Sequence, residues 1–130
     1  MIQINACDDG GSASAYSGMA IPHVNPGEPI AVTPLGAAHL QSAKSTALFK
    51  AKDLEVIRLV LLEGKSLPPH RVPGEITVQC IEGSLDVVVD GKSHVLNEGQ
   101  LMYLERGVMH SVVALEDVTA LVTVALRNEP

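Results

Sequence analysis

Aromatic residues are almost absent from this chain. Phe, Tyr and Trp together make up 2% of the 130 residues, and there is no Trp. A core without aromatic rings has to be built from aliphatic side chains, which favours β-branched packing in strands. The same scarcity leaves no platform for base or sugar stacking, and this argues against recognition of single-stranded nucleic acid.

Basic clusters and long apolar runs are absent as well. The chain has 9 Lys and Arg against 15 Asp and Glu, which gives a formal net charge of -6. Binding to a phosphate backbone draws its affinity from Lys and Arg, so we expect no nucleic-acid partner. No apolar stretch approaches the length of a membrane span, and residues 1–9 lack the features of a secretory signal. We therefore expect no membrane partner.

Cysteine is scarce too, because Cys7 and Cys80 are the only two. Such a pair is too small for a disulfide framework, and reduced thiols in the cytoplasm are the default interpretation. We therefore expect a cytoplasmic protein. Cys80 lies in an expected strand and is interpreted as a small buried apolar residue; a nucleophilic role would need a base such as His70 beside it.

The first 28 residues differ in composition from the rest of the chain. They are rich in Gly, Ser, Ala and Asp and show no helical or strand periodicity, which indicates a flexible N-terminal arm over residues 1–28. The remaining residues, 29–130, have the length of one domain. A weak helical pattern covers residues 37–43.

Short apolar segments separated by Gly and Asp turns fill the chain from residue 46. Asp90-Gly91 is the strongest hairpin signal, because both positions tolerate a positive φ. Residues 64–70 contain two prolines and are interpreted as a loop. The expected strands cover residues 46–50, 54–62, 75–81, 84–89, 92–96, 101–104, 110–115 and 118–126. About eight short strands with almost no helix predict an all-β sandwich or closed barrel.

Two glycine–histidine motifs lie within this strand-rich region. Their residues are Gly64, His70 and Gly83 in the first motif and Gly99, Gly107 and His110 in the second. In their spacing they resemble the two motifs of the cupins, and the resemblance covers the last two-thirds of the chain. It implies an all-β fold of the double-stranded β-helix type, a cupin or jelly-roll barrel.

The chain departs from the metal site that this resemblance implies. Typical cupins bind one divalent metal through two His and one Glu of the first motif and the His of the second. Here Val72 stands in the slot of the second His and Ile76 in that of the Glu, so that His70 and His110 remain. The sequence is similar to small bacterial cupins with an His-x-x-Pro-Gly stretch, here residues 70–74.

The parity of residues 75–81 decides which of them line the barrel. The two faces of this expected strand carry Ile76, Val78 and Cys80 on one side and Glu75, Thr77 and Gln79 on the other. The register of the family turns the apolar set inward. A bulge at residues 73–74 would reverse it and bring Glu75 or Gln79 to the two histidines as a third ligand for Zn, Fe, Ni or Mn. Both registers stay open at this point.

The candidate ligand pocket is built around the two histidines. The side chains expected to line it are His70, Val72, Ile76, Val78, Cys80, Tyr103 and His110. The first functional hypothesis is a small single-domain cupin that binds a small metabolite in the barrel. The resemblance also allows a metal-dependent enzyme of the oxygenase or isomerase type, or a non-catalytic sensor or structural dimer. No catalytic residue is assigned.

Apolar residues occupy both parities of segments 54–62 and 118–126. One barrel cannot bury both faces of these segments, so we expect a homodimer. Small cupins usually pair through such a sheet or exchange N-terminal strands, and by this resemblance residues 29–35 are candidates for such an exchange.

Overall fold

The computed structural model describes residues 23–126 of the chain. The expectations for residues 1–22, which include most of the proposed arm and Cys7, lie outside the described residues. The described elements are α2 (Ala37–Leu40), β2 (Thr46–Lys50), β3 (Leu54–Leu61), β4 (Ser66–His70), β5 (Ile76–Glu82), β6 (Ser84–Val89), β7 (Lys92–Asn97), β8 (Leu101–Leu104), β9 (His110–Ala114) and β10 (Val118–Ala125). No helix within residues 23–126 is long and apolar enough to cross a membrane.

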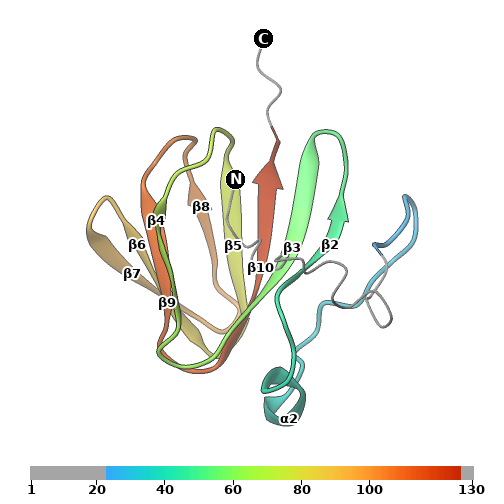
Figure 1. The fold of residues 1–130 in the computed structure, drawn as a ribbon, viewed down its shortest axis with the longest axis horizontal. Helices are drawn as coiled ribbons and strands as arrows, with labels where there is room; N and C mark the ends of the chain where they lie inside the picture. The colour runs from blue at the N-terminus through green and yellow to red at the C-terminus, as the bar shows by residue number, and fades with distance from the viewer. Residues whose placement is uncertain (1–22, 127–130) are drawn as a thin grey trace.

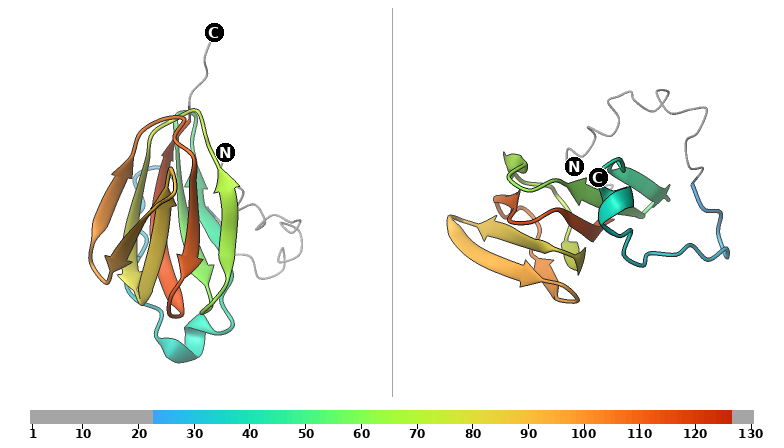
Figure 2. Two further views of the ribbon diagram at one scale, coloured as in Figure 1. Left: turned by 90° about the vertical axis from the view of Figure 1, so that its left-hand side faces the viewer. Right: turned by 90° about the horizontal axis from the view of Figure 1, so that it is seen from below.

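The strands form two antiparallel sheets that enclose one interior. The five-stranded sheet has the order β2-β3-β10-β5-β8, and the four-stranded sheet has the order β4-β9-β6-β7. In Figure 1 the four-stranded sheet lies to the left, and the two further views in Figure 2 show the sheets facing each other. The prediction of an all-β barrel of the double-stranded β-helix type is confirmed.

An aliphatic core fills the space between the sheets. Within residues 23–126, sixteen buried residues make up the core cluster, and none of these is aromatic. Along β5 the burial alternates strictly, with Ile76, Val78 and Cys80 inside and the residues between them only half-buried. Each fully buried Val, Leu or Ile contributes about 1.5–3 kcal/mol of transfer free energy. The register that turns the apolar set inward is therefore the one adopted.

The segment with two prolines forms a strand, which the sequence analysis did not expect. Pro68 and Pro69 lie within β4, whose pairing with β9 is irregular between Leu67 and His70. Proline cannot donate a ladder hydrogen bond, and it is tolerated in a sheet where the strand lies at an edge. β4 is an edge of the four-stranded sheet. The expected loop over residues 64–70 is thus wrong from Ser66 onward.

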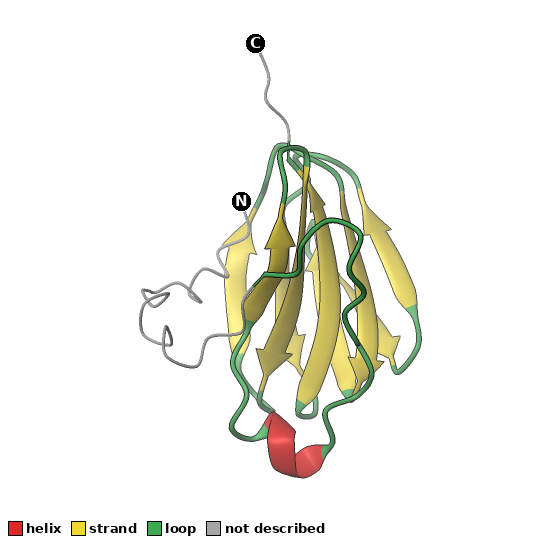
Figure 3. Cartoon of the chain, turned by 90° about the vertical axis from the view of Figure 1, so that its right-hand side faces the viewer, coloured by secondary structure: helices red, strands yellow, loops and turns green. Residues whose placement is uncertain are grey.

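Residues 23–45 run along the outside of the five-stranded sheet, and α2 lies below this sheet in the view of Figure 1. Arg58, which alternates with the buried Ile57 and Leu59, donates a hydrogen bond to the carbonyl of Ala31 at 2.8 Å. Farther along the chain, α2 buries Leu40 against the barrel. Figure 3 shows this segment crossing in front of the strands before it reaches the helix. The chain's own N-terminal segment therefore covers part of the outer face of the five-stranded sheet.

Candidate two-histidine site

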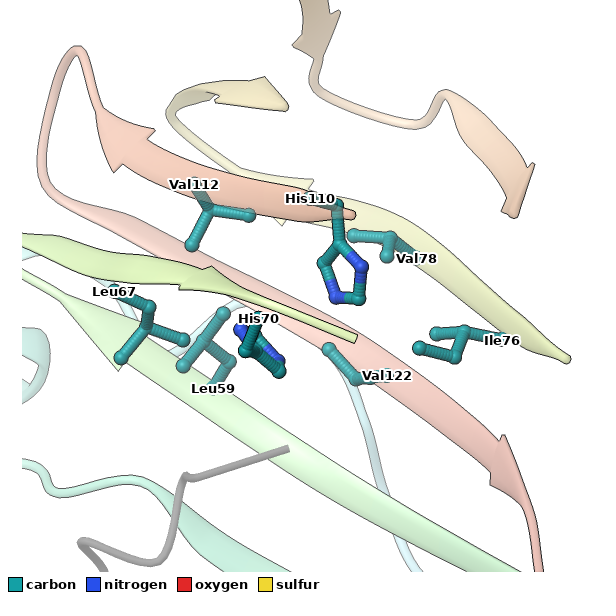
Figure 4. Close-up of a pocket in the computed structure, with 8 residues that line it drawn as sticks. All are labelled: Leu59, Leu67, His70, Ile76, Val78, His110, Val112 and Val122. Carbon is teal, nitrogen blue, oxygen red and sulfur yellow. The ribbon is translucent and has the colours of Figure 1, made fainter. Parts of the chain in front are cut away.

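The two histidines singled out by their spacing are direct neighbours across a strand pair. His70 ends β4, His110 begins β9, and the two residues are opposite each other in the antiparallel register. Their ring centroids lie 4.4 Å apart with the ring planes tilted by 56°. Directly opposed residues on one face of an antiparallel pair have adjacent side chains, so the strand register itself brings the imidazoles together. Figure 4 shows both rings pointing into the space between the sheets.

A backbone carbonyl holds each ring by its Nδ1 atom. Nδ1 of His70 lies 3.0 Å from the carbonyl oxygen of Pro68, and Nδ1 of His110 lies 3.2 Å from that of Val108. A carbonyl oxygen can only accept, so Nδ1 is the nitrogen that carries the proton whenever either ring is neutral. The Nε2 atom of each ring is then left with a lone pair, as a hydrogen-bond acceptor or a metal ligand.

The same Nδ1 contact occurs outside the site. His94, exposed on β7, has its Nδ1 3.0 Å from the carbonyl oxygen of Lys92, two residues earlier. Contact with the carbonyl two residues back is thus a local feature that also occurs on the surface. His70 and His110 differ from His94 in their surroundings, because both of their rings line an aliphatic cavity while His94 is exposed.

The two rings line a cavity of about 20 Å³. Its other walls are aliphatic and are formed by Leu59, Leu67, Ile76, Val78, Val112 and Val122. A cavity holds one water molecule when the centre of a water-sized sphere can move within about 10–15 Å³, so this cavity has room for a single small group. Within the described residues, Nε2 of His70 is buried and has no hydrogen-bond partner. A buried acceptor without a partner costs about 1–3 kcal/mol, so a donor placed in this cavity would be stabilising.

Burial keeps His110 neutral. The side chain is 4% exposed, and its desolvation lowers its pKa below the usual 6.5. The carbonyl of Val108 acts in the opposite direction, while the neighbouring His70 lowers the pKa further. At neutral pH His110 is therefore uncharged, and its Nε2 atom is available as an acceptor.

The structure brings only some of the expected pocket residues together. Ile76 and Val78 line the cavity with the two histidines. Val72 and Cys80 are buried in the core but do not line this cavity, and Tyr103 is 57% exposed. The polar part of the site is thus limited to the two imidazoles in an aliphatic surround.

Cys80 has the surroundings of a structural thiol. It is fully buried, and its Sγ atom donates to the carbonyl oxygen of Gly83 at 3.3 Å. Burial raises its pKa above the usual 9.0, and the negative charge of Glu98 raises it further. A thiol with a raised pKa is a poor nucleophile, which agrees with the interpretation of Cys80 as a small buried residue.

Neither expected third metal ligand reaches the histidines. Glu75 is exposed, and its Oε2 atom accepts a hydrogen bond from the hydroxyl of Tyr103 at 3.2 Å. Partial desolvation and the carboxylate of Glu75 raise the pKa of Tyr103. Gln79 alternates with the buried Val78 and Cys80 and so lies on the outer face of β5. The inward register of β5 is what keeps these groups out of the interior.

The side chains present do not fit the divalent metal site that the cupin motifs imply. Structural zinc takes four protein ligands and catalytic zinc usually takes three. Residues 23–126 contain no group of three or more His, Cys, Asp or Glu side chains close enough to hold a metal ion. His70 and His110 supply two nitrogen donors, and the aliphatic walls of their cavity supply none.

Sequence reasoning missed one buried acid. Glu55 is 7% exposed, and its Oε1 atom is buried without a hydrogen-bond partner among the described residues. It shares the inward parity of β3 with Ile57 and Leu59. The sequence carries no clear signal for it, because both parities of residues 54–62 are apolar and each carries one charge, Glu55 in one and Arg58 in the other.

The family model described as "Cupin domain" matches residues 57–126, more than half of the chain. This match begins within β3 and ends just after β10, so it spans both histidines and both sheets. A search among curated proteins finds no match.

Solved structures agree with the fold. A conserved protein of unknown function from Streptococcus pyogenes superposes with a TM-score of 0.66 at 23% identity, over 85% of this chain and 99% of the other. A cupin superfamily protein from Desulfitobacterium hafniense gives 0.68 at 13% identity, over 83% and 99%. A salicylate 1,2-dioxygenase variant from Pseudoaminobacter salicylatoxidans gives 0.54 at 21% identity, over 55% and 21%. At these identities the likeness concerns the fold alone.

Proposed function

The chain belongs to the cupin domain family, and from this premise we propose that it binds a small metabolite through one hydrogen-bond donor group of that ligand, held between His70 and His110. In this proposal the protein acts as a binding module that requires no metal. The acceptors are the Nε2 atoms of the two neutral imidazoles. The ligand group is an ammonium, amine, amide or hydroxyl.

One observation carries the proposal. Nε2 of His70 is buried in an apolar cavity with no partner among the described residues, while Nδ1 is already engaged by the carbonyl of Pro68. Nδ1 of His110 is likewise engaged, by the carbonyl of Val108, and its ring lines the same cavity. Because Nε2 of His70 has no donor among the described residues, the site favours a ligand that brings one.

The size of the cavity limits what enters it. About 20 Å³ admits one group of the size of a water molecule or an ammonium ion. A whole metabolite requires aliphatic neighbours to move, and Leu67 is the best placed to do so. It is half-buried and lies on β4, an edge strand whose pairing with β9 is irregular. The donor group therefore sits in the cavity, and the rest of the ligand lies toward β4.

Pairs of fragments with and without a donor test the proposal. We expect methylammonium and acetamide to shift the NMR signals of both imidazoles, and tetramethylammonium and N,N-dimethylacetamide to leave them unchanged. Very small ligands gain at most about -1.5 kcal/mol per non-hydrogen atom, so methylammonium should bind no more tightly than about 6 mM. Equal responses to the two members of a pair would contradict the donor requirement.

Substitution of each histidine tests whether the two imidazoles bind the fragments. Replacing either histidine, as His70→Ala or His110→Ala, should weaken acetamide binding about five-fold, because one neutral hydrogen bond contributes about 1 kcal/mol. His94→Ala is the matched control, since His94 has the same Nδ1 contact but is exposed on β7. The proposal fails if His94→Ala weakens binding as much as the other two variants.

The rival function is a metal-dependent cupin enzyme. It requires about one equivalent of bound metal, which the two-nitrogen donor set does not favour. Elemental analysis of protein purified without a His-tag distinguishes the two functions. We expect metal well below one equivalent, and fragment binding that persists in EDTA. A stoichiometric metal that EDTA removes together with binding would replace our proposal by the rival.

A further inference from the structure

Glu55 is a buried carboxyl group that the two-histidine site does not use. Its side chain is 7% exposed, and its Oε1 atom is buried without a hydrogen-bond partner among residues 23–126. Lys50 stands opposite it in the pairing of β2 with β3, but Lys50 is exposed. A buried carboxylate is stable only when hydrogen-bond donors or a cation compensate it. Glu55 therefore provides an interior site for a donor that carries a positive charge.

The strand register places Glu55 in the same interior as the two histidines. It stands opposite Val124 on β10, and Val124 stands opposite Ile76 on β5, which lines the histidine cavity. Val122, two residues before Val124, lines that cavity as well. Side chains on one face of a strand follow each other about 7 Å apart, so Glu55 lies about one such step beyond the cavity.

Both groups lie toward the same end of the barrel. His70 is the last residue of β4, and residues 71–75 lead from it to Ile76, in the row of Glu55. Figure 1 shows the start of β3 and the end of β10 together at the upper end of the five-stranded sheet. A ligand held by the histidines therefore has a short way to Glu55, past the end of β4.

The side chains between the two polar groups are aliphatic. Ile57, Val122 and Val124 are each 2% exposed and belong to the core cluster. A polar group in the middle of a ligand would lose its hydrogen bonds to water there without replacement. A carboxylate on the ligand would be repelled by Glu55 and by the formal net charge of -6. The surroundings thus favour a ligand with an apolar middle and a donor at each end.

We propose that the ligand is an aliphatic diamine, with one amino group between His70 and His110 and the other, as an ammonium, on the carboxylate of Glu55. This inference rests on the function proposed above and names the class of its ligand. An extended chain advances about 3.5 Å for every three bonds, so the five bonds between the nitrogen atoms of 1,4-diaminobutane span about 6 Å. A diamine of about four or five carbons therefore matches the step of about 7 Å between the cavity and Glu55.

Calorimetric titration of the full chain with a diamine and its monoamine tests the second contact. We expect 1,4-diaminobutane to bind at least about ten-fold more tightly than n-butylamine, because hydrogen bonds between charged groups are stronger than neutral ones. Glu55→Gln keeps the shape of the side chain and removes its charge. It should reduce the affinity for the diamine to that for butylamine, and change the affinity for butylamine by less than about two-fold.

A shorter diamine tests the spacing without any substitution. The three bonds between the nitrogen atoms of 1,2-diaminoethane span about 3.5 Å, which is too short to join the cavity to Glu55. We expect this diamine to bind no more tightly than ethylamine. The comparison uses the original chain, so it is valid even if Glu55→Gln does not fold.

The matched control is Glu75→Gln. Glu75 is exposed and directly precedes β5, so this substitution removes the same charge from the same end of the barrel but from outside it. An acidic protein attracts any dication, and the control separates this general attraction from binding by Glu55. We expect it to weaken diamine binding by less than about two-fold. Circular dichroism of each variant verifies that the barrel is folded.

The outcomes distinguish this inference from the function on which it rests. If methylammonium and acetamide do not bind, the proposed function fails, and the diamine fails with it. If they bind but 1,4-diaminobutane binds no more tightly than butylamine, the inference about Glu55 alone is overturned. Equal losses from Glu55→Gln and Glu75→Gln, or an equal gain with 1,2-diaminoethane, would overturn it too.

Discussion

The stability of this fold depends on pH through single side chains, and His110 is the clearest case. Its burial lowers the pKa below 6.5, the value of an exposed histidine. Below pH 6.5 the unfolded chain therefore binds more protons than the folded one. The contribution of His110 to the free energy of unfolding is therefore fully present above pH 6.5. It falls as the pH drops from 6.5 toward the pKa of His110 in the folded state, and it levels off below that pKa.

We accordingly expect His110→Gln to reduce the loss of stability between pH 7.5 and pH 5. Urea unfolding at a series of pH values measures the free energy of unfolding of each protein. His94→Gln is the control, because His94 is exposed. If the two variants lose stability with pH to the same extent as the original chain, burial of His110 is not the cause.

The second residue-scale prediction concerns Cys80. Its thiol is fully buried and its raised pKa keeps it protonated, so iodoacetamide should not modify it in the folded protein at pH 8. The measurement is mass spectrometry of a Cys7→Ser variant, in which Cys80 is the single thiol. We expect modification only in urea. Modification of the folded chain as fast as of the unfolded one would show an accessible thiol.

At the scale of elements, two glycines with similar backbone angles should respond differently to alanine. Gly83 and Gly91 have φ of 85° and 82°, but a Cβ at Gly83 would collide with the carbonyl of Asp117, whereas no atom of the described residues lies within 4 Å of a Cβ at Gly91. Left-handed strain costs about 1–2 kcal/mol at either site. The collision should bring Gly83→Ala to about 3 kcal/mol or more. Equal losses in urea unfolding would refute the close approach of the two backbones.

The carboxylate of Glu82 binds the N-terminal segment at Leu35 and Gly36. Desolvation tends to raise the pKa of Glu82, but the hydrogen bonds that its carboxylate accepts, among them those from the amides of Leu35 and Gly36, lower the pKa below 4.5. Glu82→Gln removes the charge from these bonds, and we expect roughly five-fold faster amide exchange at Leu35 and Gly36. The amide of Val24, bonded to Leu48, is the internal control. An equal acceleration at Val24 would indicate general destabilisation instead.

The elements also show where sequence reasoning is sufficient and where it is not. Period-two alternation and the Asp90–Gly91 turn predicted β5 to β7 closely, because local burial and positive φ decide them. β4 was missed because its prolines are acceptable only at a sheet edge, and edge position is a property of the whole sheet.

For the whole molecule, the resemblance of two glycine–histidine motifs to those of the cupins was enough to predict the barrel, but not the contents of its interior. The sequence allowed two registers of β5, one with an apolar pocket and one with a carboxylate in the pocket. The structure has the register with the apolar residues inside. Glu55 was missed because residues 54–62 are apolar in both parities, so the sequence does not show whether Glu55 or Arg58 faces the interior. The volume left between packed aliphatic side chains is also set by tertiary packing, which no sequence pattern specifies.

The central claim is that His70 and His110 present two unprotonated Nε2 atoms to one cavity. Long-range ¹H–¹⁵N correlation NMR of the untagged protein at pH 7.5 observes this directly, because it distinguishes the two tautomers of each imidazole. We predict the Nδ1–H tautomer for both rings, since each Nδ1 atom faces a carbonyl oxygen. We also predict a spectrum that EDTA does not change. An Nε2–H tautomer at either histidine, or ring signals that shift when EDTA removes a metal, would contradict the account.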